Sequence, residues 1–168
     1  MGMDIRDIDE LAAKQVQEAK TRGITLDFTP ETFPLLDHDL RLQAEGLAAG
    51  ATELLWCMTG AYFGAVVAQA WPGLHWRLPD VRPESWRLCC PHTALSFNPI
   101  GIAAEVQQQA EVAGWGAHVQ VRDRDKGAAA EALALYGAAR RDDYFTFAMR
   151  YEGIELLLHR LGSMHAPE

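Results

Sequence analysis

The residues with the most chemical potential lie together in the run Cys89-Cys90-Pro91-His92. Zinc takes four nitrogen or sulfur ligands, and closely spaced cysteine and histidine often supply two of them. A closed site needs a second ligand pair, but no Cys-x-x-Cys or His-x-x-x-His occurs elsewhere in the chain. Adjacent strand residues also point to opposite faces. The pattern favours one packed and one exposed cysteine, with a metal site at Cys89, Cys90 and His92 as the weaker hypothesis, and we expect no cofactor.

A nucleophilic cysteine needs a histidine base within hydrogen-bond reach and a lowered pKa. Cys90 and His92 are the nearest such pair in the sequence, whereas Cys57 lies in an apolar run where burial would raise its pKa. No glycine-rich phosphate loop and no Gly-x-Ser-x-Gly elbow occurs. An enzyme based on Cys90 and His92 therefore ranks below a protein without catalytic activity.

Two tryptophan-arginine pairs repeat along the middle of the chain, Trp76-Arg77 and Trp86-Arg87. Core packing is the simplest role for the tryptophans, but tryptophans on a sheet can also form a ligand pocket or a binding hot spot. The arginines would lie on the opposite, outward face, where neighbouring guanidinium groups could bind an anion or a partner's carboxylate. Trp76, Arg77, Trp86, Arg87 and His92 are thus the predicted binding residues.

The chain has 168 residues and a formal charge of −8. Nucleic-acid binding depends on clustered Lys and Arg, so the charge argues against a nucleic-acid partner. An acidic surface usually serves solubility, and its sharper interpretation is a docking face for a basic protein. Three cysteines make a poor disulfide framework, which together with the absence of a signal peptide favours a reducing cytoplasm. The excess of Arg over Lys and the abundant Ala hint at a GC-rich bacterial genome.

Hydrophobic periodicity predicts a helix-rich α+β protein. Apolar residues at three- and four-residue spacing predict helices over residues 4–20 and 30–45. Residues 54–71 carry no charge, which suits a buried central helix better than a membrane segment because basic flanks are absent. Within this helix Gly60 and Gly64, one turn apart, would let another backbone approach closely.

A short sheet and three further helices complete the expected fold. Apolar and polar residues alternate in three proline-separated segments, 75–78, 85–89 and 93–97, which predicts an antiparallel meander, and 116–122 could add a fourth strand. Cap and glycine signals predict helices at 98–114 and 125–137, and a last helix capped by Asp142 or Asp143. The sheet should pack on the central helix in one domain, 1–168, with frayed ends at 1–3 and 163–168.

Three segments resemble a group of small uncharacterised bacterial proteins with a Tyr-x-Gly-Glu step in a central helix. They are Phe28-Thr29-Pro30-Glu31-Thr32-Phe33 with Leu36-Asp37, Gly60-Ala61-Tyr62-Phe63-Gly64 leading to Trp76, and Asn98-Pro99 entering a helix. The resemblance covers about positions 28–110. Tyr62 and Gly64 match the step, while Ala65 stands in place of the glutamate. The resemblance implies helices around a short sheet and lends no activity.

The leading functional hypothesis is a non-catalytic domain of a bacterial cytoplasmic protein that binds another protein or itself as a homodimer, immunity-like in one version. It rests on the absence of catalytic sets, the acidic charge, the compact size and the aromatic residues. The alternative is a small-molecule or metal-binding domain that uses the sheet face. Neither version involves a nucleic acid or a membrane.

Overall fold

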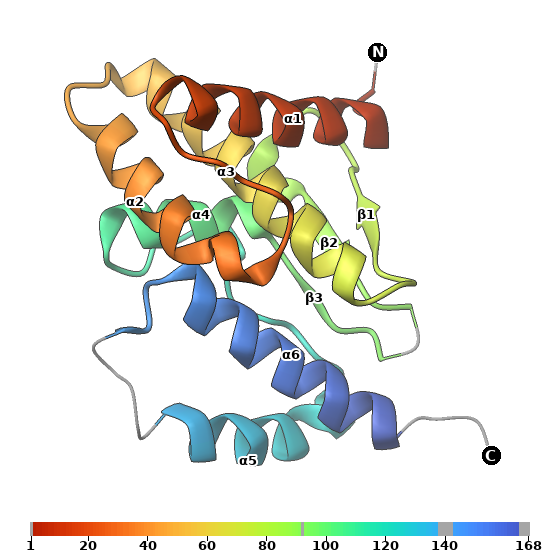
Figure 1. Ribbon diagram of the computed structural model, residues 1–168. Helices are drawn as coiled ribbons and strands as arrows, with labels where there is room; N and C mark the ends of the chain where they lie inside the picture. The colour runs from red at the N-terminus through yellow and green to blue at the C-terminus, as the bar shows by residue number, and fades with distance from the viewer. Residues whose placement is uncertain (1, 92, 138–142, 165–168) are drawn as a thin grey trace.

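Six α-helices and a three-stranded sheet make up the computed structural model, which describes residues 2–91, 93–137 and 143–164. The helices are α1 (Ile5–Thr21), α2 (Phe33–Ala44), α3 (Ala49–Ala70), α4 (Pro99–Gln108), α5 (Lys126–Gly137) and α6 (Phe147–Met164). The strands are β1 (His75–Arg77), β2 (Arg87–Cys89) and β3 (Ser96–Phe97). The architecture is the helix-rich α+β fold that the sequence predicts (Figure 1).

Helix α3 runs through the middle of the molecule and packs against α1, α2 and α4 (Figure 1). Its aromatic residues Tyr62 and Phe63 are fully buried, as predicted for the central helix. Residues Gly50–Ala70 are long and apolar enough to cross a membrane by length and composition alone. A core helix passes the same test, and 61% of this apolar window is buried inside the molecule.

The two helix glycines allow the close approach that their spacing predicts. A Cβ on Gly60 would lie 2.6 Å from the Cα of Ile100 and 2.7 Å from the carbonyl oxygen of Pro99. A Cβ on Gly64 would lie 2.5 Å from the Trp76 ring. Glycine therefore brings both the start of α4 and strand β1 into contact with α3.

The sheet is an antiparallel meander in the order β1-β2-β3, and β1 forms one edge. Trp76 lies opposite Leu88, and Leu88 lies opposite Phe97, so these three residues share the face that is turned to the core. Leu88 and Phe97 are fully buried there. The predicted fourth strand at 116–122 is reduced to one isolated bridge between Ser96 and Gln120.

Helix ends account for the remaining differences from prediction. The Asn98 side chain accepts a hydrogen bond from the Ile100 amide and caps α4 as expected. That helix ends at Gln108 rather than near residue 114, because Gln109 takes a left-handed conformation with φ of 55°. Ala110, within the predicted range of this helix, is exposed beyond the helix end.

Helix α6 is capped differently from the prediction. Asp142 lies outside the described residues, and the hydroxyl of Thr146 rather than Asp143 accepts from the Met149 amide at 3.3 Å. A carboxylate oxygen of Asp37, on α2, accepts from the Phe147 amide at 3.1 Å. The cap from Asp37 joins positions far apart in the chain, so no local pattern predicts it.

Candidate functional site

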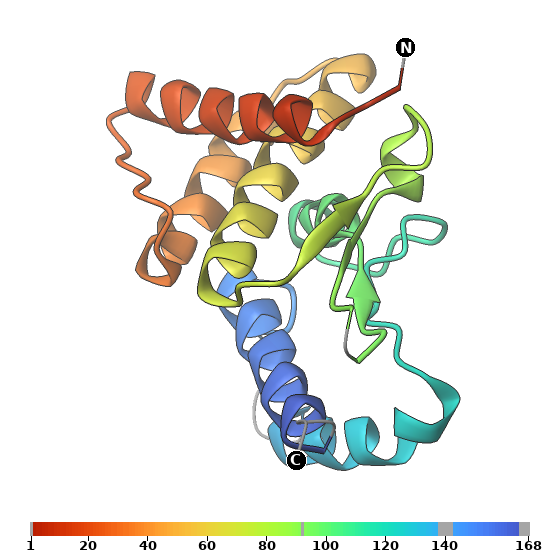
Figure 2. The ribbon, with the colours of Figure 1, turned by 90° about the vertical axis from the view of Figure 1, so that its right-hand side faces the viewer.

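A groove of about 590 Å³ lies between the N-terminal half of α1 and strand β1, with α3 as its floor. Figures 1 and 2 both place the first turns of α1 next to β1 at the edge of the sheet. The volume falls in the range of small-ligand pockets, and most of the lining is apolar. The lining residues are Met3, Asp4, Ile5, Ile8, Asp9, Ala65, Ala68, Leu74, His75, Trp76 and Leu78.

The α1 wall combines an apolar stripe with carboxylates. Ile8 is buried, whereas Ile5, one turn earlier, is 49% exposed and faces the groove. Asp4 caps the helix, because its side chain accepts from the Arg6 amide at 2.7 Å. Hydrogen bonds and attraction from Arg6 lower the pKa of Asp4, so this carboxyl is ionised at neutral pH. The Asp9 side chain is exposed and forms no hydrogen bond or ion pair with the described residues.

The β1 wall is formed by Leu74, His75, Trp76 and Leu78. Trp76 is half-buried, because its ring lies against Gly64 while the residue also lines the groove. Of the five predicted binding residues, Trp76 alone lines the groove among those that the structure describes. The contact between the Trp76 ring and Gly64 on α3 fixes the position of this tryptophan in the wall.

Trp86 belongs to the core and not to a surface site. It is 2% exposed, and its indole nitrogen donates to the carbonyl oxygen of Asp80 at 2.9 Å. The prediction that Trp86 lines a binding surface is therefore wrong. Burial with a satisfied indole N–H is the ordinary state of a core tryptophan.

Arg77 and Arg87 lie directly opposite each other on β1 and β2, as the predicted meander requires. Arg77 is exposed. Arg87 is half-buried, and its guanidinium donates to the carbonyl oxygens of Glu84 at 2.9 Å and Trp86 at 2.7 Å. It also lies against Gly116, so only Arg77 is fully available to an incoming group.

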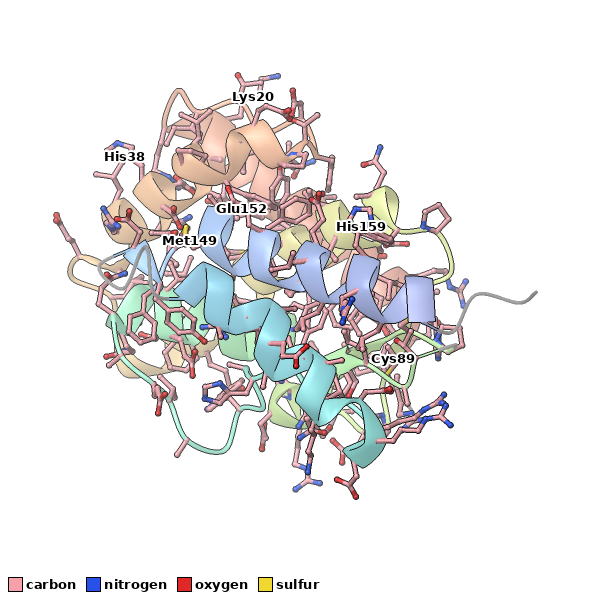
Figure 3. The ribbon with its side chains drawn as sticks, turned by 90° about the horizontal axis from the view of Figure 1, so that it is seen from below. Lys20, His38, Cys89, Met149, Glu152 and His159 are labelled. Carbon is pink, nitrogen blue, oxygen red and sulfur yellow. The ribbon has the colours of Figure 1, made fainter. Side chains whose placement is uncertain are left out.

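The cysteines do not form a catalytic or metal cluster with the described residues. Cys89 is buried and Cys90 half-buried, while His92 lies outside the described residues. Burial raises the pKa of Cys89, although Arg77 and Arg87 oppose this, and burial raises the pKa of Cys57 to about 12. Within the described ranges no three His, Cys, Asp or Glu side chains lie close enough to hold a metal ion. His38, His159 and Cys89 lie well apart (Figure 3).

The three segments that carry the family resemblance meet around Tyr62. The Tyr62 hydroxyl accepts from the Phe28 amide at 2.9 Å and lies 2.7 Å from the Thr32 hydroxyl. Phe28 has a φ of 62°, unusual for a residue with a side chain, and its ring lies 4.8 Å from that of Tyr62. The second and third segments touch through Gly60 and Pro99. The segments thus contact one another at the core, and Ala65 lines the groove.

Comparisons with protein-family models, with curated proteins and with solved structures find no match to this chain. The resemblance to a bacterial group therefore stays a prediction. The sequence analysis did not predict the groove, because it identified residues 4–20 only as a helix with one apolar face. The available signal was the pairing of Ile5 and Ile8 with Asp4 and Asp9, which sets acids beside an apolar stripe at the start of the chain.

Proposed function

We propose that this protein is a non-catalytic binding domain whose groove between α1 and β1 receives a basic, partly apolar segment of another protein. The observation that carries the proposal is the combination of an apolar groove with carboxylates on one wall. An exposed isoleucine and a half-buried tryptophan supply apolar contact area for a partner side chain. Asp9 would attract Lys or Arg on the same partner, whereas Asp4 already pairs with Arg6.

Charge over the whole molecule favours the same kind of partner. The formal charge is −8, and Asp7 and Glu10 continue the acidic surface along the first turns of α1 beside the groove. A field of one sign speeds the encounter with an oppositely charged partner, an effect that salt suppresses. The immunity-like version of the hypothesis, in which an acidic protein masks a basic one, fits this chemistry.

A short synthetic peptide tests the proposal. The probe alternates valine and threonine and ends in lysine on both sides, and its control has glutamate in place of lysine. We expect amide NMR shifts at groove residues with the lysine peptide, binding that weakens as salt rises, and weaker binding of the glutamate peptide.

Matched charge reversals locate the binding site. Asp9→Lys, on the groove wall, should weaken binding of the lysine peptide about fivefold. Glu53→Lys replaces another exposed carboxylate, on α3 and outside the groove lining, and should leave binding unchanged apart from long-range effects that salt removes. Absence of binding to the parent protein, or equal loss in both variants, would overturn the proposal.

A second candidate function rests on the opposed arginines. Like charges directly opposite on neighbouring strands are destabilising, so the Arg77–Arg87 pair suggests that an anion binds on the outward sheet face. This is the small-molecule alternative using the sheet face. Titration with inorganic phosphate should then shift the Arg77 signals in the parent but not in Arg87→Gln, and no shift in the parent would reject it.

A further inference from the structure

Hydrogen-bond alternation identifies which backbone groups of the sheet edge are unused. In an antiparallel sheet, successive residues of a strand turn their N–H and C=O to opposite sides. The Cys90 amide donates to the Leu95 carbonyl oxygen at 2.8 Å, on the β3 side. The backbone N–H and C=O of Leu88, two residues earlier, therefore also point toward β3. The same groups of its neighbours Arg87 and Cys89 point toward β1.

The register carries this alternation to the edge strand. His75 lies opposite Cys89, and Arg77 lies opposite Arg87, so both are hydrogen-bonded partners of β2. Trp76 lies opposite Leu88 and must turn its N–H and C=O the other way, out of the sheet. Neither group has a hydrogen-bond partner among the described residues. The pairing of Ser96 with Gln120 at the opposite edge obeys the same alternation.

The free backbone of Trp76 opens into the groove, since Trp76 itself and its neighbours line it. Exposed strand edges bind extended segments of other chains, with main-chain hydrogen bonds supplying affinity and side-chain pockets supplying selectivity. Residues opposite each other in a sheet share a face. A side chain placed opposite Trp76 would therefore point toward Ala65 and Ala68 on α3, whose small size leaves it room.

We propose that the partner segment binds as an added β-strand on the free edge of β1. This inference rests on the proposed function and specifies how the groove is filled. The segment lies extended between β1 and α1, pairs its backbone with Trp76, and inserts an apolar side chain over Ala65 and Ala68. A basic residue of the segment reaches the carboxylate of Asp9 on the α1 wall, which makes a basic strand the occupant that this groove fits best.

Amide hydrogen exchange of the intact protein provides the first test. On binding of the lysine-ended peptide, exchange of the Trp76 amide should slow by tenfold or more, because that N–H gains an acceptor. His75 and Arg77 serve as internal controls, since their amides already bond to β2 and should change much less. Equal protection of all three amides, or none at Trp76, would overturn strand addition.

Backbone methylation of the peptide separates the two proposals. Methylating the amides of every valine removes the donors that face β1, and should reduce affinity at least tenfold. Methylating the amides of every threonine blocks only the outer edge and should leave affinity within about threefold. If the unmethylated lysine-ended peptide binds and both methylated forms bind as tightly as it does, strand addition fails while the proposed function stands. If the parent peptide does not bind, the proposed function fails as well.

Discussion

Asp37 is the residue whose charge is most at odds with its surroundings. It is buried on α2 and accepts a hydrogen bond from the Phe147 amide at the start of α6. Burial raises the pKa of Asp37 to about 6, against a smaller lowering by the Phe147 amide and by Arg41. The folded protein therefore holds a proton that the unfolded chain releases near pH 4.

This shift predicts a pH dependence that one substitution removes. Between pH 4 and 6 the folded state binds the extra proton, so the contribution of Asp37 to stability falls as pH rises and stays low above pH 6. Asp37→Asn keeps an oxygen for the Phe147 amide but cannot ionise. In urea unfolding, the free energy of unfolding of the variant relative to the parent should rise by about 1–3 kcal/mol from pH 4 to pH 7. A constant difference across this range would contradict the raised pKa.

Residue types alone forecast some side-chain environments well. Burial of Cys57 with a raised pKa follows from its uncharged surroundings, and the Asn98 cap follows from the Asn-Pro signal. The binding role predicted for Trp86 is the exception, because this side chain is covered by the core. Nor do residue types predict Asp37 as a helix cap, since that hydrogen bond joins residues 110 positions apart in the sequence.

At the scale of elements, the contact of α3 with α4 depends on the absence of a single carbon. The Cβ that alanine would add at Gly60 would lie 2.6 Å from backbone of α4, and backbone cannot rotate away as a side chain can. Alanine normally favours a helix over glycine by about 1 kcal/mol. Here the steric cost should exceed that preference.

We expect Gly60→Ala to destabilise the protein by about 1–3 kcal/mol, measured by urea unfolding. Gly127→Ala is the matched control, because Gly127 is also helical and a Cβ there would meet nothing within 4 Å. This control should be neutral or stabilising by up to about 1 kcal/mol. Similar effects of the two substitutions would show that the α3–α4 contact adapts to the added carbon.

Element types were more predictable than element ends. All six helices follow from periodicity together with cap signals, but α4 ends six residues early because Gln109 already takes a left-handed conformation before the chain reaches Gly114. The fourth strand that 116–122 could have added amounts to one isolated bridge, so the sheet has the smaller of the two predicted strand numbers. The groove depends on three elements from distant parts of the chain, which a local pattern does not specify.

On the scale of the whole molecule, a buried ion pair connects α6, on which α5 packs, to α4. Arg150 on α6 donates to Glu105 on α4 at 2.6 Å and to the Ala117 carbonyl oxygen at 3.0 Å. Glu105 also accepts from the Val112 amide at 3.3 Å. Both charged side chains are nearly inaccessible, 6% and 1% exposed. The pair thus links α4, α6 and the segment between α4 and α5.

Breaking this pair should loosen the C-terminal helices. Glu105→Gln leaves Arg150 buried without its counter-charge, which costs about 3–5 kcal/mol. We expect a lower unfolding midpoint and faster proteolytic cleavage in the segment 110–122. Asp123→Asn, which breaks an exposed ion pair with Lys126, is the control and should leave both readouts near those of the parent. Unchanged cleavage in Glu105→Gln would show that apolar packing alone holds α6 in place.

The unpaired edge at Trp76 also bears on self-association. Two copies meeting edge to edge around a twofold axis through Trp76 would set His75 of each beside Arg77 of the other. They would also crowd the Asp4 and Asp9 carboxylates of both α1 helices around one shared groove. Like charges thus discourage such a homodimer, whereas a cationic strand from a different protein meets opposite charge. We therefore expect the carboxylates proposed to attract a basic strand to disfavour pairing of two copies along this edge.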